Sequence, residues 1–193
     1  MALLAAGSDE QRGILAGRVM LRAPASGDYA AWAALRGASR AFLAPWEPTW
    51  PPDDLTRASY RRRLRRYARE TRDDISRPFF VFRGEDGALL GSCILSNIRR
   101  GVAQTGTLGY WIGQQFAGKG YMGEAVKGLV AFSFDELGLH RIEAACLPSN
   151  EPSRRLLARV GFAEEGYARA YLKINGRWED HVLLGLVSSD WRQ

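Results

Sequence analysis

The sequence is poor in the residues that build disulfide frameworks and metal centres. Its 193 residues include two cysteines and two histidines, and Cys93 and Cys146 lie far apart in segments with the pattern of strands. Cysteines placed in this way are typical of buried thiols in a reducing compartment rather than of a disulfide or a metal site. His140 and His181 lack metal-ligand spacing and have no serine elbow nearby, so we interpret them as structural residues. We therefore expect no metal ion and a cytoplasmic protein.

Long apolar runs, a secretion signal and two common nucleotide-binding motifs are also missing. The apolar segment from Leu129 to Phe134 is soon interrupted by Asp135 and Glu136, and it falls short of the ~18 residues that span a bilayer. The N-terminus has no basic region ahead of its brief apolar patch, which argues against a signal peptide. The chain has neither GxxxxGK(S/T) nor a GxGxxG after an early strand, which excludes a P-loop and disfavours a Rossmann domain. No membrane partner is expected.

What the chain does contain is the composition of one ordinary globular domain. Apolar residues make up 46% and charged residues 25%, which disfavours disordered and fibrous classes. Residues 1–17 show no sustained periodicity and are expected to be a flexible leader, followed by a single domain over residues 18–193. The formal net charge of +6 favours an anionic partner, and a phosphorylated cofactor, RNA and an acidic protein all fit.

The stretch from Leu108 to Leu137 reads as a strand, a tight glycine turn and a long helix. In the turn, Gly118 and Gly120 lack a Cβ atom, so the backbone can bend sharply and an anion can approach the amides closely. The first N–H groups of a helix have no acceptor inside it, and the helix dipole adds partial positive charge at the same end. The stretch therefore predicts an anion site suited to a phosphate.

Hydrophobic periodicity and turn signals predict strands and helices over the rest of the chain. The expected strands span residues 18–22, 79–83, 89–98, 107–113, 140–147, 162–174 and 178–187. The expected helices begin near residue 26 or 28, near residue 53 or 54, after the glycine turn, and at Asn150 as N-cap. Asn175 and Gly176 are expected to form the turn of the closing strand pair.

The second expected helix carries a face crowded with arginine opposite its apolar stripe. The basic residues are Arg57, Arg61, Arg62, Arg63, Arg65, Arg66, Arg69 and Arg72. Such a face can contact RNA phosphates, although a solvated charged face is the commoner meaning of a run of this kind. The sequence leaves both interpretations open.

The segment FLAPWEPTWPPDD, residues 42–54, contains four prolines and two tryptophans, which predicts a structured loop rather than a regular helix. Because exposed indole rings are costly, Trp46 and Trp50 are expected to pack on the body or to line a pocket. Glu47 lies between them, either as a solvated surface residue or as a carboxylate that faces a substrate.

Two motifs combine around one expected strand. The first is Q-x-x-G-x-G from Gln115 to Gly120 before a helix, and the second runs Asn150-x-x-Ser153-x-x-Leu156-Leu157-x-x-x-Gly161-Phe162. Together they resemble the GNAT superfamily of acyl-CoA-dependent N-acetyltransferases. The segments FLAPWEP, LGYWIGQ, HRIEA, LLARVGF and EEGYARAYLKINGRWEDHVL resemble its RimJ-like branch, which acetylates the N-terminal alanine of a small-subunit ribosomal protein. The resemblance covers nearly everything from Arg18 onward.

The resemblance implies a fold and a cosubstrate. The fold is α+β (mixed α/β), with a central, mixed, mostly antiparallel twisted sheet of about seven strands flanked by about four helices. The cosubstrate is acetyl-CoA, whose pyrophosphate would be held by the turn amides and whose pantetheine would pair with the preceding strand. Asn150 and Ser153 would face the thiol end, although Asn150 also suits a simple helix cap. The implied cofactor-binding residues are Tyr110, Trp111, Ile112, Gln115, Phe116, Ala117, Gly118, Lys119, Gly120, Tyr121, Met122, Asn150 and Ser153.

The implied reaction is direct attack of an amine on the acetyl thioester. Glu47 is the candidate base, by analogy with an acidic residue on the substrate side in related branches. Ser153 or Tyr171 is the candidate proton donor to the leaving thiolate. Many superfamily members carry a glutamate on the central strand, where this chain has Tyr110 and Trp111, so the base assignment stays open.

The resemblance predicts an acyltransferase that acetylates the N-terminal α-amino group of a ribosomal protein. Contact with the ribosome or rRNA through the helix Arg57–Arg72 is a further hypothesis about partners. A GNAT enzyme acting on a small-molecule amine, such as an antibiotic or a metabolite, is the alternative. A third interpretation is a CoA-binding, RNA- or ribosome-associated protein without catalysis. We expect a monomer or a homodimer.

Overall fold

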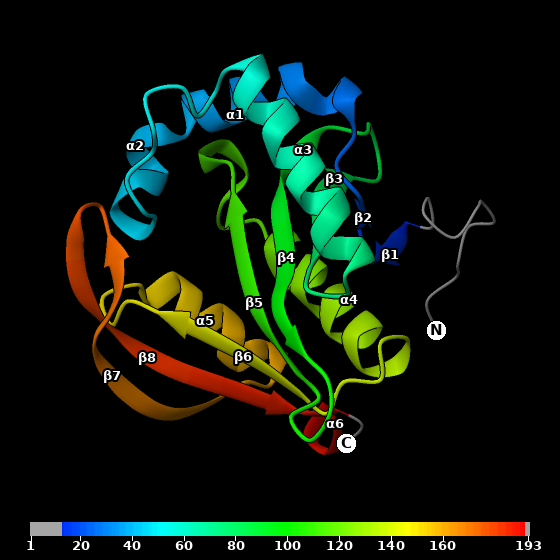
Figure 1. The fold of residues 1–193 in the computed structure, drawn as a ribbon, viewed down its shortest axis with the longest axis vertical. Helices are drawn as coiled ribbons and strands as arrows, with labels where there is room; N and C mark the ends of the chain where they lie inside the picture. Colours follow the sequence, from blue (N-terminus) through cyan, green and yellow to red (C-terminus); the bar gives the residue numbers. More distant parts are fainter. Residues whose placement is uncertain (1–12, 192–193) are drawn as a thin grey trace.

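The computed structural model describes residues 13–191 as one eight-stranded sheet with helices on both faces (Figure 1). The strands are β1 Ile14–Ala16, β2 Val19–Arg22, β3 Arg77–Arg83, β4 Leu89–Arg99, β5 Thr105–Ile112, β6 Arg141–Cys146, β7 Ala163–Ile174 and β8 Arg177–Val187. The α-helices are α1 Tyr29–Ala38, α2 Arg40–Leu43, α3 Arg57–Arg72, α4 Tyr121–Asp135, α5 Glu151–Val160 and α6 Ser188–Trp191.

The sheet splits between its two central strands. The strand order is β1-β2-β3-β4-β5-β6-β8-β7, and the pairing of β5 with β6 is parallel while the others are antiparallel. The parallel pairing begins at Thr105 with Arg141 and ends at Thr107 with Glu143. Beyond that point β5 and β6 run on without pairing to each other, and they diverge (Figure 1). The split leaves two facing backbone edges in the middle of the sheet.

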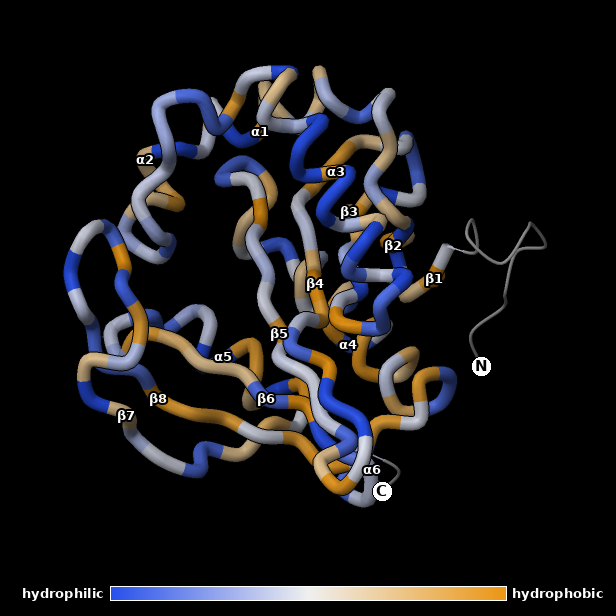
Figure 2. Tube along the Cα trace, viewed as in Figure 1, coloured by the Kyte–Doolittle hydropathy of each residue, from blue (hydrophilic) through white to orange (hydrophobic). Residues whose placement is uncertain are grey.

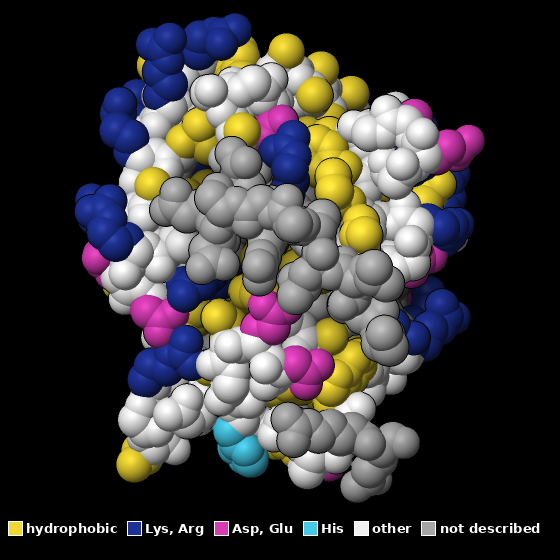
Figure 3. Space-filling view, turned by 90° about the vertical axis from the view of Figure 1, so that its right-hand side faces the viewer, with side chains coloured by type: hydrophobic (Ala, Val, Ile, Leu, Met, Phe, Trp, Pro, Cys, Tyr) yellow, Lys and Arg dark blue, Asp and Glu magenta, His cyan; other side chains and the backbone are white. Residues whose placement is uncertain are grey.

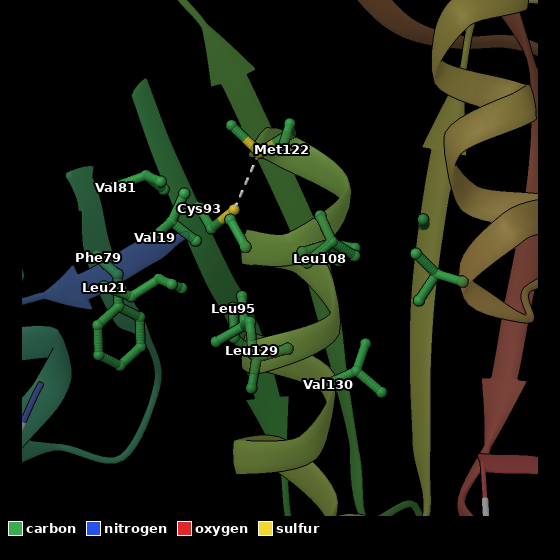
Figure 4. Packing of buried hydrophobic residues seen from close by; sticks show 14 of the residues in the cluster. Val19, Leu21, Phe79, Val81, Cys93, Leu95, Leu108, Met122, Leu129 and Val130 are labelled. Carbon is green, nitrogen blue, oxygen red and sulfur yellow. Dashed lines mark hydrogen bonds between the residues drawn. The ribbon is translucent and has the colours of Figure 1, made fainter. Parts of the chain in front are cut away.

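Different helices cover the two faces of the sheet. Helices α1 and α3 lie over one face, and α4 and α5 lie over the other (Figure 1). Between α1 and α3, the rings of Trp32 and Tyr60 pack with centroids 4.9 Å apart. On the opposite face, the Met122 sulfur of α4 lies 3.3 Å from the Cys93 sulfur of β4 (Figure 4). Figure 2 shows that the second half of β8 is apolar, whereas α3 is mostly hydrophilic.

The mixed, mostly antiparallel sheet confirms the expected fold class. It has eight strands rather than about seven because Ile14–Ala16 adds an edge strand to β2. There are six α-helices in the described chain rather than about four, because α2 and α6 are separate four-residue helices. Helix α2 is separated from α1 at Ser39, whose buried hydroxyl accepts a hydrogen bond from the Gln114 backbone N–H over 3.0 Å.

The expected leader, residues 1–17, falls only partly within the described chain. Residues 1–12 lie outside the described residues, whereas β1 pairs with β2 and packs on α4. The Ile14 side chain is only 8% exposed. Burial of Ile14, together with the pairing to β2, explains a strand in a segment without periodicity.

The signals at the ends of α5 and of the closing hairpin are confirmed. The Asn150 side-chain oxygen accepts a hydrogen bond from the Ser153 backbone N–H over 3.2 Å, and Gly161 ends the helix with a φ of 112°. Asn175 and Gly176 have φ angles of 43° and 85°, the left-handed pair that a type I′ hairpin turn requires.

The start of α3 differs from the expectation. Its N-cap is Thr56, whose hydroxyl accepts a hydrogen bond from the Ser59 backbone N–H over 3.2 Å. The expected caps, Asp53 and Asp54, instead form ion pairs with arginines of α3. A carboxylate close to guanidinium groups gains more from pairing than from capping, which sequence position alone does not reveal.

Both cysteines are buried free thiols, as expected, and burial raises the pKa of Cys93. No helix within residues 13–191 combines the length and the apolar character needed to cross a membrane.

Candidate active site

The glycine turn between β5 and α4 exposes a row of backbone amides. Gly118 and Gly120 have left-handed φ angles of 74° and 86°, which glycine adopts without steric cost. The N–H groups of Phe116 and Ala117 donate to carbonyl oxygens three residues earlier, over 2.9 and 3.2 Å. In the part of the chain that the structure describes, the N–H groups of residues 118–123 have no acceptor. The free amides therefore begin at Gly118, so the amides of Phe116 and Ala117, two residues implied to bind the cofactor, are already used within the turn.

Arg18, in the turn between β1 and β2, braces this glycine turn. Its Nη2 donates to the Lys119 carbonyl oxygen over 2.9 Å and pairs with Glu124, in the first turn of α4, at 2.5 Å. Its guanidinium also lies 4.6 Å from the centroid of the Tyr121 ring. On the other side the turn is open, since a Cβ atom added to Gly118 would meet no heavy atom within 4 Å. The turn is thus a fixed cradle with room for an anionic group.

The split end of β5 sends neighbouring side chains to opposite faces of the sheet. Tyr110 pairs with Cys93 in register and points toward α4 and α5. Trp111 points toward α1, where the Arg36 guanidinium lies 4.8 Å from its ring centroid. In the described chain, the edge of β5 that faces β6 has no strand partner beyond Thr107, so its backbone groups can pair with another extended molecule.

Three protic side chains meet at the split. The hydroxyl groups of Tyr110 and Ser153 lie 2.7 Å apart and join β5 to α5. Burial raises the pKa of Tyr110, and the hydrogen bond with Ser153 opposes this only in part, so the phenol is protonated at neutral pH and can donate. Cys146, at the end of β6, lies beside Ser153, and burial raises the pKa of its thiol.

The other predicted cofactor residues lie around the cradle with different exposures. Gln115 and Lys119 are exposed, Tyr121 lies beneath Arg18, and Met122 is buried in the core rather than turned to the cradle. Asn150 uses its side-chain oxygen as the cap of α5, and its side-chain nitrogen has no acceptor within residues 13–191. That nitrogen is the atom through which Asn150 can act beyond capping.

Glu47 is paired with a buried arginine on the α1 side of the sheet. Two guanidinium nitrogens of Arg36 donate to its two carboxylate oxygens over 2.8 Å each, and the Trp50 indole N–H donates over 2.7 Å. Arg36 is 7% exposed and stacks between the Trp50 and Trp111 rings, with centroid distances of 4.0 and 4.8 Å. These contacts fix the loop that follows α2 beside the end of β5. We call Arg36, Glu47, Trp50 and Trp111 the acceptor wall.

The tip of the β7–β8 hairpin reaches the same loop. The Asn175 N–H donates to the Glu47 carbonyl oxygen over 2.9 Å, and a cavity of about 80 Å³ lies between loop and hairpin. Tyr171, on β7, packs its ring edge-on against His181 with centroids 5.7 Å apart. No hydrogen bond among the described residues joins Tyr171 to the Tyr110–Ser153 pair. The structure brings Ser153 together with Tyr110, and it does not bring Tyr171 to them.

The predictions from sequence did not include Arg18, Arg36 or the Tyr110 hydroxyl as site groups. Arg18 is 106 residues from Glu124, and Tyr110 is 43 residues from Ser153. No local spacing marks contacts of that range. For Arg36 a weak signal existed, because this charged residue continues the apolar pattern of α1.

Comparison with known proteins identifies the family. The model of the acetyltransferase (GNAT) domain matches residues 18–163. The chain belongs to the GNAT acetyltransferase family. It is 37% identical over 153 residues, 79% of each chain, to the ribosomal protein uS5-alanine N-acetyltransferase of Escherichia coli (strain K12). It is 38% identical over 159 residues to the probable N-acetyltransferase YjcK of Bacillus subtilis (strain 168), covering 82% of this chain and 88% of YjcK.

A solved GNAT structure shows the same architecture. Mycobacterium smegmatis RimJ in complex with CoA-disulfide superposes with a TM-score of 0.86 and 33% identity, over 94% of this chain and 85% of that one. The matches confirm the expected superfamily and the RimJ-like resemblance. The protein is thus a GNAT acetyltransferase, which transfers an acetyl group from acetyl-CoA to an amino group. The open cradle of unpaired amides fits the pyrophosphate of such a cosubstrate.

Proposed function

We propose that this GNAT acetyltransferase acts in the cytoplasm on the N-terminal α-amino group of a ribosomal protein that begins with alanine. The observation that carries the proposal is the exposed hairpin beside the split sheet. Its large exposed side chains, 43–65% accessible, are Tyr167, Tyr171, Leu172 and Trp178. β7 is also the last strand of the sheet, so one of its backbone edges is unpaired in the described chain. Such a surface suits an extended polypeptide better than a small amine, which needs an enclosed pocket.

The similarity to relatives supports the same substrate class. The Escherichia coli relative is named for acetylating an alanine of ribosomal protein uS5, and it matches 79% of this chain. We propose that the amine enters at the split end of β5, and the contact between the acceptor wall and the hairpin tip at Glu47 and Asn175 supports this entry.

We assign the cosubstrate to the side of the split that lies away from the acceptor wall. The amides of residues 118–123 would hold the pyrophosphate, and the free edge of Tyr110–Ile112 would pair with the pantetheine amides. The Asn150 side-chain nitrogen and the Ser153 hydroxyl would face the thiol end. When bound, acetyl-CoA supplies a thioester carbonyl that an amine can attack directly.

The deprotonation that the amine requires is modest. An α-amino group has a pKa near ~8, so roughly a tenth of it is already neutral at pH 7. We propose Glu47 as the base that accepts the proton, directly or through water, because it is the carboxylate of the acceptor wall. It would do so while held by Arg36 and Trp50, which orient both of its oxygens.

Ser153 is the proposed donor to the leaving thiolate, with Tyr110 as the group that resupplies its proton. Tyr110→Phe should lower kcat about tenfold and leave the KM for acetyl-CoA nearly unchanged, because only a hydroxyl is lost. Ser153→Ala should give a similar loss, and the double variant little more, since both residues act in one relay. Release of CoA, followed with a thiol reagent at saturating substrates, measures the effect.

Tyr60→Phe provides the matched control for Tyr110→Phe. This buried tyrosine of α3 also loses one hydroxyl, which donates to the Ala25 carbonyl oxygen over 2.7 Å. It should lower stability by about 1 kcal/mol without changing kcat. A normal kcat for both Tyr110→Phe and Ser153→Ala would exclude the relay.

The acceptor itself is tested with purified enzyme and acetyl-CoA. A peptide with an alanine-starting ribosomal N-terminus should release CoA and gain one acetyl group on its α-amine by mass spectrometry. The same peptide with a blocked α-amine should be inert. Turnover of small amines without turnover of the free peptide or of intact ribosomal protein would contradict the proposal and favour a small-molecule acceptor.

A further inference from the structure

Helix α3 carries the whole net positive charge of the protein. Its 16 residues hold eight arginines and one glutamate, a net charge of +7. The full chain has a formal net charge of +6, so the residues outside α3 sum to −1. An excess of positive charge spread over the whole surface says little about binding partners. An excess confined to a single helix indicates an electrostatic binding surface.

Ion pairs divide the eight arginines into two groups. Three of them pair with carboxylates: Arg62 with Asp53, Arg63 with Asp54, and Arg66 with Glu70. The other five are exposed and have no carboxylate partner in the described chain, and we call them the arginine stripe: Arg57, Arg61, Arg65, Arg69 and Arg72. Arg57 lies over the Tyr29 ring at 4.3 Å, a contact that leaves its charge available.

The arginine stripe follows one side of α3. Its members are four, four, four and three residues apart, and each step of four turns about 40° around the helix and advances about 6 Å. The stripe therefore covers about 120° of the helix surface and about 22 Å of its length. Seen from the side of β1, Lys and Arg side chains follow the left-hand margin of the molecule, the side on which α3 lies (Figure 3).

The regular spacing fits a polyanion better than a protein surface. A protein interface is anchored by aromatic or large aliphatic side chains at its centre. Outside the stripe, the exposed residues of α3 are two alanines, a threonine and two paired arginines, while Tyr60 and Leu64 pack toward the core. Evenly spaced guanidinium groups, each able to bind a phosphate through two N–H groups, instead match a phosphodiester chain.

We propose that the arginine stripe binds the phosphate backbone of RNA and docks the enzyme beside its acceptor. α3 covers the same sheet face as α1, the helix that contributes Arg36 to the acceptor wall (Figure 1). RNA bound along α3 would therefore lie on the acceptor side of the molecule. That this RNA belongs to the ribosome rests on the proposed function, whereas RNA binding itself does not.

Two neighbouring double variants test the stripe. Arg61→Gln/Arg65→Gln removes two stripe charges, and the control Arg62→Gln/Arg66→Gln removes two paired charges from the same turns. Glutamine keeps the helix propensity of arginine, so both should fold, which far-UV circular dichroism checks. The probe is a mixed-sequence single-stranded RNA of roughly 20 nucleotides. Binding is followed by fluorescence anisotropy between about 50 and 500 mM salt, a decade over which the slope reports the number of phosphate contacts.

The salt dependence gives the expected result. Five phosphate contacts predict a slope of log K against log salt of about −3.5, and loss of two contacts a slope of about −2. The stripe variant should bind about 25-fold more weakly at 0.1 M salt, and the control less than about threefold. Equal losses in the two variants, or equally tight binding of polyglutamate of the same length, would overturn the assignment to RNA.

The acetylation rates of the stripe variant on two acceptors distinguish a failure of this inference from a failure of the proposed function. On the free alanine-starting peptide the stripe variant should match the unmodified enzyme, and on intact ribosomal subunits it should be slower by a factor similar to its loss of RNA affinity. If the stripe variant were as fast as the unmodified enzyme on ribosomal subunits as well as on the peptide, docking through the stripe would be overturned. Salt-dependent RNA binding by an enzyme that ignores the peptide would instead refute the proposed acceptor and leave RNA binding established.

Discussion

Replacing Gly120 by valine is expected to raise the KM for acetyl-CoA ten- to hundredfold while kcat at saturation changes much less. Gly120 has a φ of 86° at the N-cap of α4, where a β-branched residue is strained by roughly 1–2 kcal/mol. Relief of that strain would turn the N–H groups of residues 118–123 away from the proposed pyrophosphate position. The added side chain would also meet Arg18, whose Nη2 lies 3.1 Å from the Cβ position. Initial rates over a range of acetyl-CoA concentrations measure the change.

Gly138→Val separates binding from general strain. Gly138 follows the other end of α4, has a φ of 65°, and has no heavy atom within 4 Å of a Cβ atom at that position. It should lose a similar amount of stability in denaturant unfolding and keep the normal KM. If Gly120→Val kept the normal KM, or if Gly138→Val raised it equally, the cradle would not be the pyrophosphate site.

Arg36→Met is expected to lower the free energy of unfolding by about 3 kcal/mol, since it leaves the Glu47 carboxylate partly buried without its cation. The Glu47 side chain is 20% exposed and the Arg36 side chain 8%, so water compensates little for the loss. Methionine fills much of the volume of the arginine stem between the two tryptophan rings, which limits the packing loss. The melting temperature should fall by roughly 6–12 °C for a chain of this length.

Arg40→Met is the matched control, because Arg40 is exposed and lies 5.5 Å from the same Trp50 ring. It should cost less than about 0.5 kcal/mol. Adding Glu47→Gln to Arg36→Met should recover part of the stability, because no unpaired carboxylate remains. If Arg36→Met and Arg40→Met were equally mild, the pair would not anchor the acceptor wall.

The single variant Glu47→Gln separates a base from an anchor through its pH profile. Loss of a base should lower kcat most at low pH, where the α-amino group is largely protonated. Loss of an anchor should lower the rate by the same factor at every pH. An unaltered profile shape would therefore count against Glu47 as the base and leave it as a part of the wall.

Local chemistry explains which predictions from sequence were accurate. Glycines with φ above zero, a Pro-containing first helical turn after Asn150 and the Asn175-Gly176 turn all act within a few residues, so the sequence reveals them. The predicted N-cap of α3 was wrong because a contact with residues farther along the chain outweighed the local preference. Asp53 and Asp54 are good caps by local preference, but pairing with arginines about one and a half turns into α3 overrides it.

The sequence by itself determined the anion cradle, the family and the concentration of arginine in one helix, because each depends on residue types close together in the chain. Only the tertiary structure decided which arginines are free, since the pairing of Arg62 and Arg63 depends on how the preceding loop returns to α3. It also decided that the split of β5 from β6 brings Tyr110 to Ser153 and that Arg36 meets Glu47. Such contacts arise from strand register and from helix packing on opposite sheet faces, and no spacing along the chain records them.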